Sequence, residues 1–420
     1  MALNKRLIAR LDIKGSRLIK GIRFEGLRVI GEPCDSAFKY YSSGIDEIFY
    51  SDAVASLYGR NSLSDLLKNT CKNIFVPVTA GGGIRSIDDG HNLLKAGADK
   101  LAINSYAVKN PEILTLLSKR FGSQCVVLSI QARRSAGINS GWEVMIESGR
   151  EKTGIDLIDW IRESQKLGIG EILLTSVDRD GTQQGPDMEL LKLVDPEIST
   201  PLIFGGGFSR INEIKDAFEF KSLSGISIGT SIHYGKIDIQ KIKSEVNTSK
   251  IRFRESSKTT IKHKEYSLKN ISTVIIDYGM GNQQSLINSL HKLGSNVLLT
   301  DNRKIIEEAE IIILPGVGSF PSGMEELNRR GLTEAIRNRH NSGKSILGIC
   351  LGMQLLFEES NEFKVTKGIG IFEGSVKSLK ELYLDIANKE SAYISEEIPL
   401  PHMGWNKLYE IEGNLKKINK

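Results

Sequence analysis

The stretch Ala80-Gly81-Gly82-Gly83-Ile84-Arg85-Ser86 recurs later in the chain as Phe204-Gly205-Gly206-Gly207-Phe208-Ser209-Arg210. Each copy follows a short apolar run and precedes a helix-forming stretch. Two further pairs of polar residues recur at nearly the same interval: Asp12 with Gln131, and Asp52 with Asp178. Because an internal repeat constrains the whole architecture, it takes priority over the assignment of single elements. The repeat predicts two half-domains of similar build within the first 246 residues.

Short β-rich runs alternate with helical stretches from Leu7 to about Lys243. The predicted strands span residues 7–12, 47–52, 76–81, 100–104, 125–131, 171–176, 201–205 and 225–229. Eight strands, most of them followed by a helical stretch, predict a closed (β/α)₈ TIM barrel over residues 1–246 rather than an open sheet. In such a barrel the chemistry lies at the C-terminal ends of the strands.

Polar residues occupy these predicted strand ends, namely Asp12, Asp52, Asn104, Gln131, Asp178 and Asp180. The glycine triplets beside them leave backbone N–H groups free to approach a phosphate. The predicted phosphate-binding residues are Gly82, Gly83, Asn104 and Ser105 in the first half, and Asp180, Gly181, Gly206, Gly207, Thr230 and Ser231 in the second. The glycines could instead serve tight turns only. Their duplication at matching strand ends favours two phosphate sites and a substrate with a phosphate at each end.

Composition excludes several functional classes. A hydrophobic content of 40%, a charged content of 25% and a net charge of +5 are ordinary globular values. No dense basic block with interleaved aromatic residues suggests a nucleic-acid partner. The four cysteines lie far apart, which argues against a zinc site or a disulfide framework and favours a reducing, cytoplasmic setting. We expect no signal peptide, no membrane span, no metal and no cofactor.

A second pattern follows the predicted barrel. Ser, Thr, Lys and Arg dominate residues 247–270, where we expect a basic interdomain linker. Residues 271–277 then read as a strand, followed by a helix to about Leu293 and a buried strand at residues 311–314. This alternation predicts an open parallel α/β sheet in residues 271–420, with functional turns at the strand C-termini.

The segment Gly348-Ile349-Cys350-Leu351-Gly352-Met353-Gln354 places a thiol between two glycines. An apolar run precedes it and a helix-forming run from Met353 to Glu358 follows, which predicts a strand, a sharp turn and a helix. At the turn, the helix dipole would lower the thiol pKa, and the next backbone N–H could stabilise an oxyanion. A free cysteine is also often just a small buried hydrophobe, so the motif alone leaves both interpretations open.

Both halves resemble the imidazole glycerol phosphate synthase family. The first 246 residues are similar to its cyclase subunit at residues 10–14, 79–85, 98–104, 120–124 and 170–181. Residues 271–420 are similar to its glutaminase partner, a class I glutamine amidotransferase, at residues 277–282, 315–318, 348–354 and 401–406. The resemblance implies glutamine hydrolysis in one domain and use of the released ammonia in the other.

The resemblance also implies roles for individual residues. Cys350 would attack the glutamine amide to form a thioester, with Gln354 near the substrate. The oxyanion hole would comprise the amide of Val317 or Gly318, beside Gly316, together with that of Leu351. Ammonia would enter the barrel through a charged gate, for which the matching residues are Arg6, Glu47, Lys100 and Glu171. At the other mouth, two aspartates would assist lyase cleavage and ring closure of a substrate with two phosphates.

The barrel departs from the cyclase pattern at two positions. Asp12 matches the first catalytic aspartate, but the partner position holds Gln131, whose amide exchanges no proton near pH 7. Losing one positioned acid or base typically costs on the order of 10² to 10⁴ in rate, so we expect weak cyclase activity unless another aspartate compensates. Arg10 stands where the family has a small residue or cysteine. Residues 55–63 resemble a divergent branch associated with amino-sugar pathways of surface polysaccharides.

The amidotransferase half departs from its family at the C-terminus. Class I enzymes activate the thiol with a late histidine and glutamate, and no histidine follows Trp405 here. His402 falls in a segment that the family uses near the subunit interface. We therefore expect a C-terminally truncated domain whose Cys350 lacks its base and is a poor nucleophile unless a separate glutaminase fragment supplies it.

Three functional hypotheses remain open. The first is glutamine-dependent nitrogen transfer of the imidazole glycerol phosphate synthase type, with glutamine and a phosphorylated small molecule as ligands. The second is an ammonia-supplying module that serves a separate sugar amidotransferase in amino-sugar amidination. The third is a non-catalytic scaffold that binds a phosphorylated ligand. None of them involves nucleic acid or a membrane.

Overall fold

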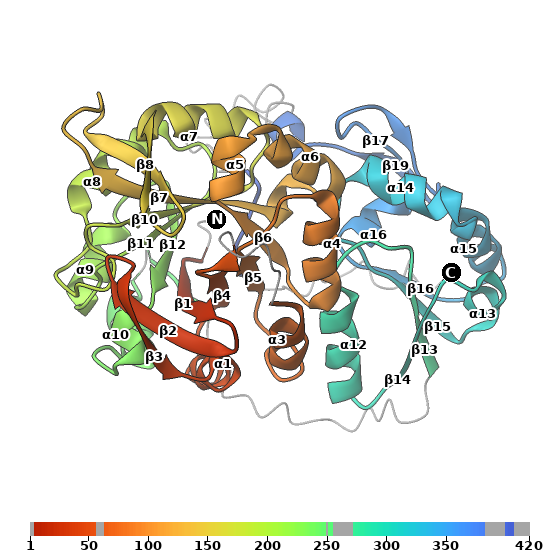
Figure 1. The fold of residues 1–420 in the computed structure, drawn as a ribbon. Helices are drawn as coiled ribbons and strands as arrows, with labels where there is room; N and C mark the ends of the chain where they lie inside the picture. Colours follow the sequence, from red (N-terminus) through yellow and green to blue (C-terminus); the bar gives the residue numbers. More distant parts are fainter. Residues whose placement is uncertain (1–3, 56–62, 249–250, 255–271, 383–399, 407–420) are drawn as a thin grey trace.

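The computed structural model describes residues 4–55, 63–248, 251–254, 272–382 and 400–406. A closed ring of eight parallel strands forms its larger part (Figure 1). In ring order these are β1 (Arg6–Lys14), β4 (Glu47–Asp52), β5 (Val78–Gly81), β6 (Lys100–Ile103), β7 (Val126–Arg134), β10 (Glu171–Ser176), β11 (Leu202–Gly205) and β12 (Leu223–Ile228). The pairings of β7 with β10 and of β12 with β1 complete the ring. Every predicted strand overlaps an observed one, and the predicted (β/α)₈ barrel is confirmed.

Helices surround this ring. They are α1 (Pro33–Ser42), α3 (Leu63–Thr70), α4 (Ile87–Ala96), α6 (Glu112–Phe121), α7 (Leu157–Lys166), α8 (Met188–Val194), α9 (Ile211–Ala217) and α11 (Ile239–Val246). The shorter α5 (Ser105–Lys109) and α10 (Thr230–His233) start directly after β6 and β12. Side-chain caps start several of the longer helices: Ser86 accepts from the Asp89 amide at α4, and Asp238 accepts from the Lys241 amide at α11. Such caps satisfy amides that have no partner within the helix.

Two hairpins, which the sequence patterns did not predict, extend the barrel at the C-terminal ends of its strands. β2 (Arg17–Ile22) pairs with the end of β1 and with β3 (Glu25–Gly31). β8 (Trp142–Ile146) pairs with the end of β7 and with β9 (Glu151–Asp156). Both hairpins therefore stand beside the mouth where the site residues are expected.

The interior of the ring is layered. Ile8, Phe49, Ala102, Val127, Leu173 and Ile203 form one buried apolar cluster inside it. Because alternate residues of a strand face the same side, Arg6, Ile8, Arg10 and Asp12 share the inner face of β1. On β1, Arg6 thus lies on the side of the apolar cluster where the strands begin, and Arg10 and Asp12 lie on the side where the strands end.

The remaining described residues form a smaller α/β domain. Its parallel sheet has the order β14 (Asn296–Thr300), β13 (Ser272–Ile276), β15 (Ile311–Leu314) and β16 (Ile346–Gly348). Its helices are α12 (Gln283–Lys292), α13 (Arg303–Glu308), α14 (Phe320–Arg329), α15 (Leu332–Asn341) and α16 (Leu351–Leu355). A second small sheet contains β17 (Phe357–Ser360), β18 (Thr366–Lys367) and β19 (Phe372–Val376). The predicted open parallel sheet is confirmed.

One predicted boundary is wrong. The helix after Cys350 was expected to run to Glu358, but α16 ends at Leu355 and Glu358 belongs to β17. The chain turns there because Phe357 pairs with Phe372 of β19, so tertiary pairing overrides the local helix preference.

The barrel also extends into the predicted linker. Ile251 and Phe253 pack into the barrel core, and Lys5 pairs with Phe253. Linker residues 249–250 and 255–270 lie outside the described residues, as does most of the loop at residues 55–63 that carries the resemblance to a divergent branch. No helix in the described part of the chain is long and apolar enough to cross a membrane.

The smaller domain docks on the face of the barrel where the strands begin. Asn282 caps α12 and also donates to the carbonyl oxygen of Gly97 (2.8 Å) and to Asp99 (3.0 Å), just before β6. Arg120, at the end of α6, forms an ion pair with Glu326 of α14 at 3.1 Å. In Figure 1, α12 and α14 accordingly lie beside α4 and α6.

Candidate functional site

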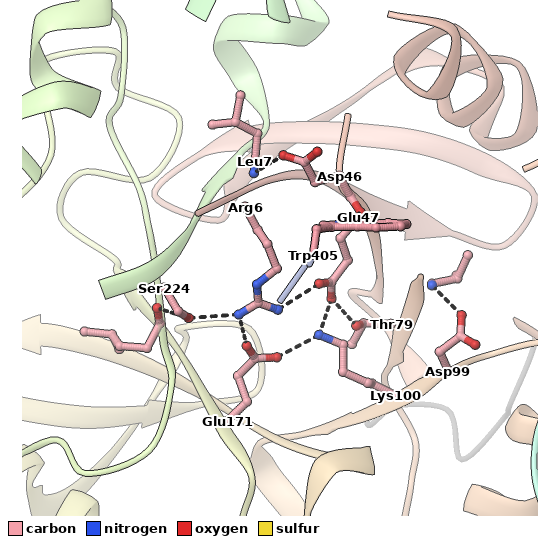
Figure 2. A network of polar contacts seen from close by, with 12 residues as sticks. Arg6, Leu7, Asp46, Glu47, Thr79, Asp99, Lys100, Glu171, Ser224 and Trp405 are labelled. Atoms are coloured by element: carbon pink, nitrogen blue, oxygen red, sulfur yellow. Dashed lines mark hydrogen bonds and ion pairs between the residues drawn. The ribbon is translucent and has the colours of Figure 1, made fainter. Parts of the chain in front are cut away.

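The four residues predicted as an ammonia gate form one closed network at the start of the barrel strands (Figure 2). Arg6 bonds to Glu47 at 3.0 Å and also to Glu171, while Lys100 lies 2.6 Å from Glu47 and 2.7 Å from Glu171. Thr79 donates to Glu47 (2.6 Å), and Arg6 donates to Ser224 (2.8 Å). All four charged side chains are buried.

Electrostatics keep this network charged. Burial alone would raise the pKa of the Glu171 carboxyl, but Arg6 and Lys100 outweigh burial and lower it. Burial likewise opposes the charge on Arg6, but Glu171 and Glu47 raise the pKa of its guanidinium. Two cations and two anions therefore balance each other in a place that water barely reaches.

The first glycine loop opens into a cavity of about 240 Å³. Its lining includes the predicted residues Gly82, Gly83, Asn104, Ser105 and Gln131, together with Glu147 from the turn between β8 and β9. We call this space the first cavity. At Gly82, φ is +118° and an added Cβ would lie 2.9 Å from the carbonyl oxygen of Asp52, so the turn itself requires glycine. The glycines are thus explained without a phosphate, and the phosphate role remains a prediction.

The second glycine loop lines a much smaller space, which we call the second cavity. It lies among Arg10, Asp180, Gly206, Gly207, Ser227 and Gly229, and its volume is about 20 Å³. A volume of that size holds about one water molecule. Ser231, predicted as a phosphate ligand, instead donates to the carbonyl oxygen of Phe208, whereas the neighbouring buried Thr230 Oγ1 has no partner among the described atoms. The two glycine loops therefore follow equivalent strands, but the cavities that they line differ greatly in volume.

Asp12 lies at the mouth within a cluster of opposite charges. Arg10 donates to one of its oxygens at 2.8 Å, and Lys20 of β2 donates to the other at 2.9 Å and also to Asp180. Burial would raise the pKa of Asp12, but Arg10 and Lys20 outweigh burial and hold it well below its usual range. A carboxylate held in this way is a poor proton donor or acceptor near pH 7.

Arg10 crosses the inside of the barrel. Its guanidinium donates to Thr175 of β10 at 3.0 Å, and it stacks over the rings of Phe24 and Phe49 at 5.2 and 5.9 Å. β10 lies almost opposite β1 in the ring order. Sequence comparison singled out Arg10 only as a departure, and its reach across the lumen could not be inferred from position alone.

Gln131 takes the inner mouth position of β7, as predicted from the repeat. Its side chain is buried and lines the first cavity, but the oxygen Oε1 has no hydrogen-bond donor among the described residues. It can orient a bound group but cannot exchange a proton.

Cys350 occupies the predicted elbow between β16 and α16. Its φ is +53°, a conformation that residues other than glycine rarely adopt. An added Cβ at Gly352 would collide with the carbonyl oxygen of Leu314, and one at Gly348 would lie 2.6 Å from Met353 Cα. Both flanking glycines are therefore sterically required, and the residue is exposed as expected for a nucleophile.

The expectation of a lowered thiol pKa is wrong. Partial burial of the sulfur raises the pKa of Cys350, the Leu351 amide lowers it only in part, and Glu362 raises it further. The physical reason is that α16 is only five residues long, so its dipole is weak beside the loss of water around the thiol. No hydrogen bond joins this thiol to a histidine in the described segments of the chain.

The predicted oxyanion residues lie around the elbow. An added Cβ at Gly316 would approach Leu351 Cβ at 2.9 Å, so the two loops touch there, and Tyr278 holds the first loop by donating to the carbonyl oxygen of Pro315 (2.6 Å). Val317 packs against the barrel core, and Gly318 lies near the backbone of Arg120. Gln354 lies on α16, where its backbone N–H donates to the carbonyl oxygen of Cys350 (3.1 Å).

Glu362 is a site residue that sequence reasoning missed. Its carboxylate accepts from the Phe320 amide at 2.6 Å and influences the Cys350 thiol. The only signal for it was a run of acidic residues shortly after the elbow. No group of His, Cys, Asp or Glu suited to a metal ion occurs among the residues that the structure describes.

A barrel with a charged network at its base, joined to a domain that carries a cysteine elbow, defines an enzyme of the lyase and glutamine amidotransferase class. Comparison with known proteins agrees with this class. The model of the family "Histidine biosynthesis protein" matches residues 6–238, and that of "Glutamine amidotransferase class-I" matches residues 274–415. The chain belongs to the histidine biosynthesis protein family, here fused to a class I glutamine amidotransferase domain.

Individual relatives are similar over the barrel. The imidazole glycerol phosphate synthase subunit HisF of Legionella pneumophila is 56% identical over 210 residues, which cover 50% of this chain and 98% of that protein. Subunits of the same name from Wolinella succinogenes and Prochlorococcus marinus (strain MIT 9515) are 44% and 42% identical. Each of these two matches covers 60% of this chain and 98% of the relative. Histidine biosynthesis, the barrel and the amidotransferase class are thus supported together.

Proposed function

We propose that this chain transfers nitrogen from glutamine through the barrel to a phosphorylated substrate, in the manner of imidazole glycerol phosphate synthase. Glutamine would be attacked at Cys350, and ammonia would pass the Arg6–Glu47–Lys100–Glu171 network into the mouth. There it would meet a substrate with two phosphates that undergoes lyase cleavage and cyclisation. The relatives named HisF support the reaction class, and the docking geometry supports the route.

One observation supports the proposed route of ammonia into the barrel. The smaller domain contacts the barrel near the ends of α3 and α6 and at the turn before β6, through Asn288, Ser319 and Asn282. This is the face where the charged network lies. Trp405 also reaches this face and donates to the carbonyl oxygen of Asp46 at 3.3 Å, beside Glu47 (Figure 2). This docking therefore favours a route by which ammonia released in the smaller domain would reach the network.

The test uses glutamine labelled with ¹⁵N in its amide. Purified chain should release labelled ammonia, and a Cys350→Ser variant should not, because serine is a far weaker nucleophile without an adjacent base. Equal hydrolysis by both proteins would refute the assignment of Cys350. No hydrolysis by the wild-type chain, either alone or with the second chain proposed below, would favour the scaffold hypothesis.

Activation of Cys350 requires a base that the described residues do not place beside it. Among the described strands, β16 lies at the edge of its sheet, and Leu347 and Ile349 are exposed next to the elbow. An unpaired edge strand with exposed apolar side chains is suited to pairing with another polypeptide. We propose that a second chain, a separate glutaminase fragment, pairs here and supplies the histidine and glutamate. Its addition should raise glutaminase turnover by the factor of 10² to 10⁴ that is typical of general base catalysis.

A second candidate function is the supply of ammonia to another enzyme, such as a sugar amidotransferase. The observation that favours it is the missing acid–base pair, because Asp12 is held by Arg10 and Lys20 and its partner position holds Gln131. Complementation distinguishes the two. Growth of a histidine auxotroph that lacks the cyclase, expressing this chain and supplied with ammonia, would refute the second candidate. Failure to grow, despite folded protein, would favour it.

A further inference from the structure

An apolar cluster inside the barrel separates the charged network from the first cavity. Phe49 and Ala102 stand two residues after Glu47 and Lys100 on the same inner strand faces. Both belong to the apolar cluster inside the ring, and both also line the first cavity. Arg10 lines the second cavity instead, with its guanidinium over the Phe49 ring. On the proposed route, a small molecule that passes this cluster would therefore emerge in the first cavity.

Two residues that line this cavity each carry a buried acceptor atom that has no hydrogen-bond donor among the described residues. These atoms are Oε1 of Gln131 and Oε2 of Glu147, and the two residues are only 6% and 7% exposed. A buried acceptor without a donor typically costs about 1–3 kcal/mol, and more if it is charged. Two such atoms on residues that line one cavity indicate a ligand that brings donors to them.

The surrounding structure holds Glu147 in this position. It starts the turn between β8 and β9, where Glu147 and Ser148 both have left-handed φ values, +49° and +58°. The Glu147 amide donates to Ser105 Oγ at 3.0 Å, which ties the turn to α5. The cation beside Glu147 is Lys109, whose half-exposed side chain lies 3.4 Å from the other oxygen, Oε1. The remaining oxygen, Oε2, has no hydrogen-bond partner among the described residues.

We propose that Glu147 and Gln131 together form a binding site for a cationic nitrogen. The ligand class is a phosphate monoester that carries an amine or amidinium group, with its phosphate at the Gly82–Gly83 and Asn104–Ser105 side of the cavity. The carboxylate selects a charged donor over a neutral one, because a hydrogen bond between charged groups is about twice as strong. This site would hold the nitrogen that the reaction installs, so the inference rests on the proposed function.

The test compares two phosphate monoesters of equal length by isothermal titration calorimetry. O-phosphoethanolamine carries an ammonium group, whereas n-propyl phosphate ends in a methyl group. We expect the wild-type chain to bind the first about tenfold more tightly, as one charge-assisted hydrogen bond would give. Glu147→Gln should remove this preference. The control Glu151→Gln, an exposed acidic residue on the same hairpin, should retain it.

Each result has one meaning. Equal binding of both esters by the wild-type chain overturns this inference and leaves the phosphate site standing. Binding of neither ester overturns the phosphate site of the proposed function, and this inference with it. Because the wild-type preference is measured without any substitution, the proposal can be refuted even if Glu147→Gln fails to fold. A preference that survives in correctly folded Glu147→Gln would also overturn it.

Discussion

Replacing Glu171 by glutamine should destabilise the barrel strongly. The carboxylate is fully buried and bonds to Arg6 and, at 2.7 Å, to Lys100. Glutamine keeps the shape but removes the charge, so two buried cations would face Glu47 alone. Breaking a buried ion pair from one side costs about 3–5 kcal/mol, because the remaining charge stays buried without compensation.

The measurement is urea unfolding followed by the fluorescence of Trp142 and Trp160, both of which are buried in the barrel. The double variant Lys100→Met/Glu171→Leu removes one cation and one anion together and should recover most of the loss. A matched control is Glu197→Gln, which breaks the ion pair of Glu197 with the exposed Arg162 and should change little. A single variant within about 1 kcal/mol of the wild type would refute the assignment of a dry, balanced network. The same assignment would be refuted if the double variant lost as much stability as the two single substitutions lose when their effects are added.

Three further predictions concern the domain contact and the thiol. Asn282→Ala should cost about 1–2 kcal/mol through loss of the α12 cap, and should also speed hydrogen exchange at Gly97 and its neighbours, because the contact with the barrel is lost. Burial raises the pKa of Asp99 to about 6, so its stabilising contribution is present below an unfolded pKa of about 3.9 and is lost as pH rises through 6. The wild type should therefore lose about 1 kcal/mol of stability between pH 5 and pH 7, and Asp99→Asn, measured by urea unfolding at both pH values, should not. Because burial raises the pKa of Cys350, its alkylation by iodoacetamide should be slow at pH 7 and accelerate above pH 8.5. Glu362→Gln should speed this alkylation, because it removes a negative charge near the thiol. Fast alkylation of the wild type at pH 7 would contradict a raised pKa.

The barrel strands could be predicted because each combines a short apolar run with a polar residue at its end, and the repeat fixes their order. β4, β10 and β15 match the predicted bounds at both ends. β14 (Asn296–Thr300) was not predicted, because its apolar run is only three residues long and none of its residues is buried at the edge of the sheet. The two hairpins were missed for a similar reason, since half of each faces solvent.

The site could be predicted as a set of residues but not as an arrangement. Local sequence placed Cys350 at an elbow, but the pKa of its thiol depends on Glu362 and on packing from other segments. Glu147 showed no motif, because its role comes from a turn that folds over α5. The difference in volume between the two cavities could not be predicted from the sequence either, because the two glycine triplets are alike. Arg10 lines the second cavity but not the first.

The position of Arg10 has an evolutionary consequence. In a barrel with Arg10, changing Gln131 to aspartate adds a proton-exchanging group, but its partner Asp12 stays bound to two cations. In a barrel with Gln131, changing Arg10 to a small residue removes one of the two cations that hold Asp12, but Lys20 stays bound and Asp12 still lacks a partner acid or base. Neither step alone should improve cyclisation, so selection cannot favour the first of them. Such mutual dependence, or epistasis, would make the departure from the cyclase residue pattern difficult to reverse by later single mutations.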